Sequence, residues 1–265
     1  MKRVVATTGA VFLFASSLAD AGIVMDMVTR DASGAETDRA KIYAQGNKIR
    51  MEEGSVAGAS MIFLGDSFIY VDHSDRSYIV MDEAMLDEVS AQMNEAMAEM
   101  EAQLAEMPAE QRAMVEEMMK GQMQGMMGQQ GPKPPPPRVE PMGSGEWNSG
   151  DCQEYAVYDG DEKTQQICAA ALDDVDGADE LIEAFRNMAA YMTKMAEKLP
   201  MGRGDQSNPG ELIEQIDGFP VHTIQYENGA VVREELLDSV VDQDLDEEMF
   251  AAPSGYRQKD PFAGR

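Results

Sequence analysis

The segment DRAKIYAQGNKIRMEEG, residues 38–54, indicates the fold of this chain most clearly. Charged and apolar residues alternate from Lys48 to Glu52, so an extended strand would have one apolar and one charged face. Gly46-Asn47 separates two such runs, and a turn dipeptide in this position favours a hairpin. We therefore expect an antiparallel meander with one covered face.

The same pattern recurs elsewhere in the chain, in short runs rich in Val, Ile, Tyr and Phe. These runs are GIVMDMVTR (22–30), SMIFLGDSFIYVD (60–72), SYIVMD (77–82), FPVHTIQYE (219–227) and AVVREELLDSVV (230–241). The last two meet at Asn228-Gly229, a strong hairpin dipeptide. A helix is predicted from Ala178 to Leu199, after Asp176-Gly177, so the fold class is α+β.

A methionine-rich stretch, residues 93–127, holds 10 of the 23 methionines. Apolar residues recur there at intervals of three and four, as on one side of an amphipathic helix that begins at Glu83. Pro108 interrupts the pattern and fits the first turn of a second helix. We expect a helical hairpin over residues 83–127.

The methionines of this stretch form a candidate surface for an apolar ligand or for Cu(I). Its members are Met93, Met97, Met100, Met107, Met114, Met118 and Met123. Thioethers are soft ligands suited to Cu(I), but methionine is also a flexible apolar residue that fills cores and contacts varied partners. Leu104 takes a position in the same stripe, which favours structural packing over a metal site. A mobile cover over a ligand is the other alternative.

Residues 128–144 read as a linker rich in Pro and Gly, in which Pro134 to Pro137 favour polyproline II. Strand patterns lie on both sides of the predicted hairpin. We therefore expect residues 22–82 and 145–262 to form one discontinuous domain, into which the hairpin and the linker are inserted.

The two cysteines, Cys152 and Cys168, lie in DCQEYAVYDGDEKTQQICAA, a predicted hairpin. If Tyr158 faces Glu162, then Cys152 directly faces Cys168, and directly opposed residues are close enough to bridge. We expect one disulfide.

The first 21 residues have the pattern of a secretory signal peptide. Lys2 and Arg3 precede a short apolar run, and Ala19-Asp20-Ala21 fits a cleavage site, so cutting is expected after Ala21. The apolar run is too short for a membrane span. These features predict an exported periplasmic protein without transmembrane segments.

The net charge of −28 argues against nucleic acid as a partner and against adsorption to anionic lipid. His73 and His222 are the only histidines, and neither lies in a recognisable nucleophile motif. The acidic segment near residue 244 lacks the glycine and glutamate of a calcium loop, and Asp244 to Glu247 instead fits a capping box. We expect no enzymatic activity.

Several stretches give the chain a family resemblance. They are GIVMDM at residue 22, KIYAQGNKIRME at 41, FIYVDHSDRSYIVMD at 68, CQEY at 152 and MFAAPSGYRQKDPF at 249. With these stretches the chain resembles exported bacterial proteins of the domain of unknown function 4412. More distantly it resembles the LolA/LppX group of lipoprotein-sorting and lipid-carrying proteins. That resemblance implies an open half-barrel, a curved antiparallel sheet with helices on its concave face.

The combined interpretation is a periplasmic protein that binds an apolar ligand, either lipid or lipoprotein, or an envelope protein. One alternative is a methionine-rich Cu(I)-binding protein. Another is an envelope scaffold without a small ligand.

Overall fold

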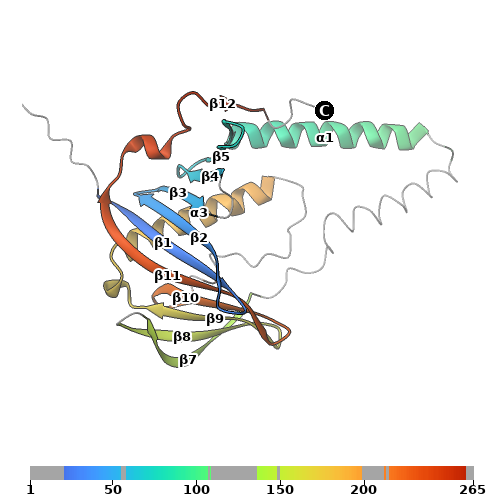
Figure 1. Ribbon diagram of the computed structural model, residues 1–265. Helices are drawn as coiled ribbons and strands as arrows, with labels where there is room; N and C mark the ends of the chain where they lie inside the picture. Colours follow the sequence, from blue (N-terminus) through green and yellow to red (C-terminus); the bar gives the residue numbers. More distant parts are fainter. Residues whose placement is uncertain are drawn as a thin grey trace, which may run out of the picture.

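The computed structural model describes residues 21–54, 58–106, 108, 136–147, 150–198, 212 and 215–260. These residues form a twelve-stranded sheet with two long helices, α1 and α3 (Figure 1). The strands are β1 (Ala21–Asp31), β2 (Glu36–Gln45), β3 (Lys48–Glu53), β4 (Ala59–Phe63), β5 (Phe68–Asp72), β6 (Ser77–Met81), β7 (Arg138–Trp147), β8 (Gly150–Asp159), β9 (Glu162–Ala170), β10 (Phe219–Glu227), β11 (Ala230–Asp244) and β12 (Arg257–Gln258). The helices are α1 (Glu83–Glu106), η1 (Leu172–Asp174), α3 (Ala178–Lys198) and η2 (Glu247–Phe250).

The sheet is antiparallel except at one edge, and it does not close. Its order is β12-β6-β5-β4-β3-β2-β1-β11-β10-β9-β8-β7, and only the short β12 pairs in parallel, with β6. The pairing of β1 with β11 joins the N-terminal meander to the strands that follow α1. The predicted open antiparallel sheet is confirmed, with strands before and after α1 in one discontinuous sheet.

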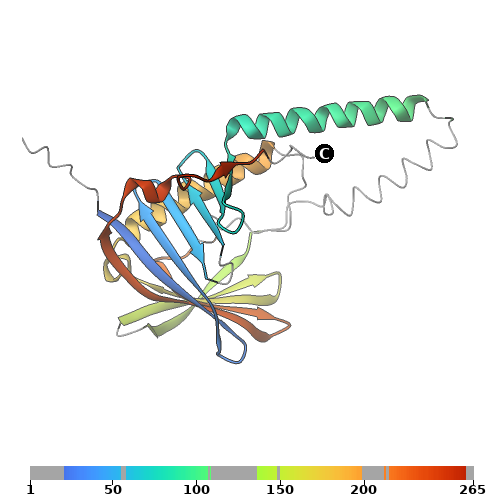
Figure 2. The same cartoon turned by 45° about the horizontal axis from the view of Figure 1, so that its top comes forward.

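The face of the sheet that α3 covers, here called the inner face, carries the largest part of the core. Leu181 of α3 is fully buried in one cluster with Ile23 and Val221, and Tyr191 packs on Phe63 in a second cluster. Trp147 of the edge strand β7 belongs to the first cluster, so the sheet bends inward until β7 approaches β11. Helix α3 therefore packs against one face of the sheet, as Figure 1 and Figure 2 show.

Gly177 positions the start of α3 against β1. Its φ of 67° lies in the left-handed region, which glycine adopts without steric cost. A β-carbon at this position would collide with the side chain of Ile23. The carbonyl oxygen of Gly177 also accepts a hydrogen bond of 3.0 Å from the Leu181 amide. The predicted Asp176-Gly177 boundary thus coincides with the observed helix start.

The opposite, outer face is covered in two patches. The first patch is made by the C-terminal segment, which packs over Ile62 and Val71 through Leu245, Phe250 and Tyr256. A separate cluster covers β8 and β9, where residue Ile216 packs with their outward side chains. Between the patches the outer face of β1, β2 and β11 is charged.

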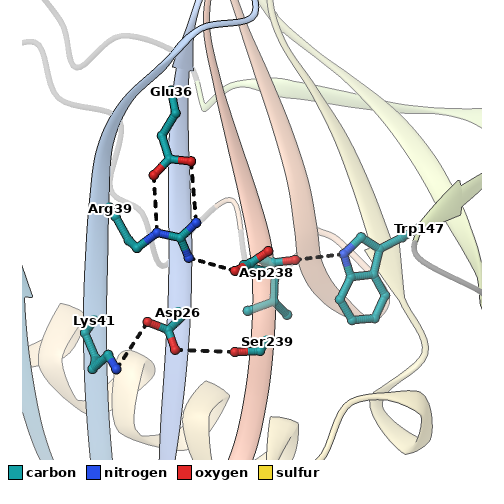
Figure 3. Close-up of polar contacts among 8 residues, drawn as sticks. Asp26, Glu36, Arg39, Lys41, Trp147, Asp238 and Ser239 are labelled. Carbon is teal, nitrogen blue, oxygen red and sulfur yellow. Dashed lines mark hydrogen bonds and ion pairs between the residues drawn. The ribbon is translucent and has the colours of Figure 1, made fainter.

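Figure 3 shows this charged surface, with Arg39 between Glu36 and Asp238 and with Asp26 between Lys41 and Ser239. The side chain of Arg39 is 45% exposed and that of Asp238 is 53% exposed. Exposed ion pairs of this kind contribute little to stability.

The disulfide between Cys152 and Cys168 is confirmed, but the predicted strand register is wrong. Cys152 is opposite Ala170, and Glu154 is opposite Cys168, so the bonded cysteines are diagonal neighbours. Two features together cause this two-residue difference. Asp159 pairs with Glu162 across a two-residue turn, which moves the register by one residue, and a register shift between Val157 and Tyr158 moves it by one more. The Cα atoms of the two cysteines are 5.5 Å apart, within the usual range for a bridge.

Strand β7 begins at Arg138, inside the segment 128–144 that the sequence assigned to a linker. Pro141 cannot donate a ladder hydrogen bond, and a register shift occurs between Pro141 and Gly143. Both features are tolerated because β7 is an edge strand. Because prolines and glycines are typical of linkers, the sequence pattern did not predict this strand.

The capping residue of η2 is Asp246 rather than the predicted Asp244. The Asp246 carboxylate accepts a hydrogen bond of 3.1 Å from the Glu248 amide. Asp244 is still the last residue of β11, paired with Ala21, so it cannot also begin the helical turn.

Candidate functional site

Three members of the predicted methionine surface, Met93, Met97 and Met100, lie on α1, which leaves the body of the protein after its first two turns. Leu86 is buried at the base, and the Ser90 hydroxyl donates a hydrogen bond of 3.2 Å to the Lys198 carbonyl of α3. Beyond Ser90 the helix extends away from the sheet (Figure 2). Met97 is 41% exposed and Met100 is 36% exposed.

These exposed fractions correct the interpretation of the stripe as core packing. Met93 is half-buried, and Met97 and Met100 are exposed, because in the described part of the chain no strand packs beneath this part of α1. The helix ends at Glu106, immediately before the predicted break at Met107-Pro108. The remaining members of the predicted surface, Met107, Met114, Met118 and Met123, lie outside the described residues, as does the predicted second helix.

Charged groups hold the base of α1 on α3. The Lys198 ammonium lies 2.8 Å from the Glu83 carboxylate and 2.7 Å from that of Asp87. The hydrogen bond from Lys198 and the positive charge of Lys194 lower the pKa of Glu83. Hydrogen bonds to Asp87 and Glu83 raise the pKa of Lys198. The direction of α1 is therefore fixed by its first turns.

A second methionine surface, which the sequence did not reveal, lies on the inner face. Residues that are directly paired in register across β2 to β6 form one row on that face; they are Ile42, Met51, Met61, Tyr70 and Ile79. None of the five is fully buried, and the phenol-bearing Tyr70 is 38% exposed.

The neighbouring row of the same face is closed by contrast. Phe63 and Phe68 are almost fully buried, and their rings lie 5.8 and 5.6 Å from the Tyr191 ring of α3, measured between centroids. Burial raises the pKa of Tyr191, and its hydroxyl group donates to the Met81 carbonyl at 3.3 Å. Helix α3 thus seals one row and leaves the next row only partly covered.

Methionines of α3 border the partly covered row. Met188 and Met195 pack against the same buried cluster as Met51 and Met61. Met192 follows Met188 by four residues, on the same side of the helix, and is 49% exposed. We call the set of Ile42, Met51, Met61, Tyr70, Ile79, Met188 and Met195 the inner strip.

The chemistry of the inner strip is that of an adaptable apolar surface. Its members carry no charge, four of the seven are flexible thioethers, and Tyr70 has an apolar ring with a polar end. An aliphatic or aromatic group of varied shape could pack here. Strand alternation in the sequence assigns Met51 to the apolar face of its strand. Which part of that face α3 covers depends on tertiary packing, so the sequence alone could not predict it.

Ser60 and His73 form a close polar pair on the outer face. The Ser60 hydroxyl oxygen lies 2.8 Å from His73 Nε2, and the Tyr256 hydroxyl oxygen lies 3.0 Å from Nδ1. Arg50 also donates to the Ser60 oxygen at 3.2 Å. Ser60 is only 3% exposed, so this network ties the C-terminal segment to the sheet rather than presenting a nucleophile to solvent.

The other histidine, His222 of β10, lies 3.7 Å from the Glu234 carboxylate through Nε2. Among the described residues, no group of three or more His, Cys, Asp or Glu side chains could hold a metal ion. In the same part of the chain, no helix has the length and apolar character needed to cross a membrane.

Comparisons with solved structures give distant similarities. An uncharacterised conserved protein from Thermus thermophilus aligns with a TM-score of 0.45 and 8% identity, covering 91% of this chain and 90% of its own. MucB, in a crystal structure of its complex with MucA(peri), aligns with a TM-score of 0.37 and 7% identity, covering 90% and 57%. The LolA superfamily protein NE2245 from Nitrosomonas europaea aligns with a TM-score of 0.31 and 8% identity, covering 89% and 91%.

No curated protein matches the sequence significantly. One family model does match it, over a region that begins at the first residue of β7 and ends at Tyr256 in the C-terminal segment. Residues 138–256 therefore match the family described as Domain of unknown function (DUF4412), as the sequence resemblance predicted.

Proposed function

We propose that this protein is an exported, non-enzymatic binding protein that holds an apolar ligand on the inner strip, which forms part of the concave face of the sheet. The observation that carries the proposal is the partly covered row of half-buried Met51, half-buried Met61 and exposed Tyr70, beside a row that is buried. A face built only for stability would bury both rows, because full burial of an apolar side chain contributes about 1.5 to 3 kcal/mol relative to full exposure and a half-buried side chain gains only part of this.

The proposed ligand is the acyl chain of a lipid or of a lipoprotein. Thioether side chains adapt their rotamers to a flexible chain, and the partly exposed phenol of Tyr70 can remain hydrated at the edge of the strip. The distribution of charge agrees with this choice, since the strip itself is uncharged while the outer face carries Arg39, Lys41 and their acidic partners.

The proposed location is the periplasm. The leader-like residues 1–21 motivate this proposal, and the bond between Cys152 and Cys168 supports it, because disulfides persist in oxidising compartments.

Extraction of the natively purified protein, followed by mass spectrometry of the extract, tests the proposed function. We expect wild type to retain a lipid or an acylated peptide, and the variant Met51→Gln/Met61→Gln to retain at least ten-fold less. Met142→Gln is the matched control, because Met142 is 52% exposed on the edge strand β7, away from the inner strip. Repeated recovery of wild type without any apolar ligand would contradict the proposal.

Cu(I) binding by α1 is the second candidate function. It is motivated by Met93, Met97 and Met100, which follow one side of the helix, two of them exposed. A competition titration against a Cu(I) chelator tests this candidate function by comparing wild type with a variant in which all three methionines are replaced by Leu. This candidate would be removed if wild type took up no Cu(I), or if the Leu variant took up as much Cu(I) as wild type.

A further inference from the structure

The methionine side of α1 continues the surface by which the helix docks on the body. Leu86, Met93 and Met100 are spaced by seven residues, and Ser90 and Met97 fall between them at the alternate positions of a heptad repeat. Leu86 and Ser90 contact the body, whereas Met97 and Met100 are exposed. The outward continuation, which consists of half-buried Met93 and exposed Met97 and Met100, is here called the α1 seam.

A heptad seam is suited to another helix. Sixteen residues of α1 follow Ser90, about 24 Å at 1.5 Å per residue. Helices of this length gain most of their stability from packing of an apolar face rather than from intrinsic propensity. The heptad positions that flank the seam are Asn94, Ala96, Glu101 and Gln103, so the only charged residue at its margins is acidic.

The charge of α1 selects among partners. Residues 83–106 include seven acidic residues and no Lys or Arg. Glu95 and Glu99 are exposed on the side away from the seam, and the whole chain carries a net charge of −28. A second copy of this chain and an anionic lipid surface would both be repelled, whereas a cationic partner would be attracted and steered toward the helix.

We propose that the α1 seam binds a cationic amphipathic helix of another protein. The apolar side of that helix would pack on Met93, Met97 and Met100, and its Lys and Arg residues would be attracted by the acidic α1. This is recognition of an amphipathic helix through an adaptable methionine surface. The proposal concerns a surface separate from the inner strip and stands independently of ligand binding there.

The experiment uses the full chain with its disulfide intact and a labelled 21-residue peptide as probe, with binding followed by fluorescence anisotropy. The probe has Leu at the two seam positions of each heptad and Lys at the others. Two matched peptides accompany it: one with the same composition in scrambled order, and one with Glu in place of every Lys. We expect the probe to bind at least ten-fold more tightly than either matched peptide.

Protein variants then locate the binding surface. Met93→Gln/Met97→Gln/Met100→Gln should weaken probe binding at least ten-fold, whereas replacement of the same three residues by Leu should preserve it. Glu95→Gln/Glu99→Gln should weaken binding less and reduce its dependence on salt. Met142→Gln, on the edge strand β7, is the control, and far-ultraviolet circular dichroism of each variant checks that the helix remains folded.

Three results would overturn the proposal. Equal binding of the scrambled peptide would mean adsorption by charge alone, and equal binding of the Glu peptide would mean that charge has no part. Sedimentation of wild type as a dimer, lost in the Gln variant, would assign the seam to a second copy instead.

Discussion

The indole nitrogen of Trp147 donates a hydrogen bond of 3.1 Å to the carbonyl oxygen of Leu237, although β8, β9 and β10 lie between their strands in the sheet. A flat sheet would hold β7 and β11 about 19 Å apart, at roughly 4.8 Å for each strand spacing. The contact is therefore possible only because the sheet curls around its inner face. The curl also brings Trp147 against the core cluster that contains the disulfide.

Trp147→Phe tests the contribution of this contact. The substitution keeps an aromatic ring but removes the donor, so the free energy of unfolding should fall by about 1 kcal/mol. Urea denaturation followed by circular dichroism gives the value; fluorescence cannot, because Trp147 is the single tryptophan of the chain. A variant as stable as wild type would show that the hydrogen bond does not hold the curl.

Removal of the disulfide should destabilise the same end of the sheet. Cys152→Ser/Cys168→Ser opens a loop with a sequence separation of 16 residues, and the chain-entropy model gives a loss of about 3 kcal/mol. We expect a lower urea midpoint for the double variant and for wild type treated with a reductant. The double variant should not respond to the reductant, which controls for other effects of that treatment.

Acid should loosen the base of α1. The pKa of Glu83 lies below its ordinary value because of the hydrogen bond from Lys198 and the charge of Lys194. The stabilising contribution is therefore present above the unfolded pKa of about 4.3 and is lost as the pH falls through the lower folded pKa. Hydrogen exchange of α1 amides, corrected for intrinsic rates, should show less protection at acid pH.

Lys198→Met provides the comparison for this acid effect. Without the ammonium group, protection at the base of α1 should already be reduced at neutral pH and should change little on acidification. Lys163→Met, on the distant β9, should behave as wild type does. A pH response of equal size in the Lys198 variant would assign the effect to other carboxylates.

The network of Ser60, His73 and Tyr256 should hold the C-terminal segment on the sheet. Tyr256→Phe removes the hydroxyl group that lies 3.0 Å from His73 Nδ1. Amide exchange should then accelerate at Arg257 and Lys259, whose amides bond to carbonyl groups of Arg76 and Tyr78. A change worth about 1 kcal/mol corresponds to roughly five-fold faster exchange. Tyr158→Phe, on β8, should leave these amides unchanged.

Strand alternation was sufficient to predict much of the fold. The segment 48–52 alternates in the structure as it does in the sequence, with Ile49 in the inner core and Arg50 bonded on the outer face. Local patterns could not predict β7, where Pro141 and Gly143 disguise a bulged edge strand. They also could not give the shift at Val157, because a single unpaired residue leaves no trace in hydrophobic periodicity.

The candidate site was less predictable than the fold. Helical spacing predicted the stripe of Met93, Met97 and Met100, but its exposure depends on where α1 leaves the body at Ser90. The inner strip could not be predicted, because Met51 and Met61 resemble ordinary core residues until α3 is placed beside them.

Photo-crosslinking tests the central claim, ligand binding on the inner strip, most directly. The full-length protein would be equilibrated with a fatty acid that carries an aliphatic diazirine, irradiated, digested and sequenced by mass spectrometry. We predict adducts on peptides that contain Met51, Met61 or Tyr70, with competition by the unlabelled fatty acid and at least ten-fold less labelling in Met51→Gln/Met61→Gln. Labelling confined to α1, or labelling that the unlabelled fatty acid does not reduce, would contradict the account.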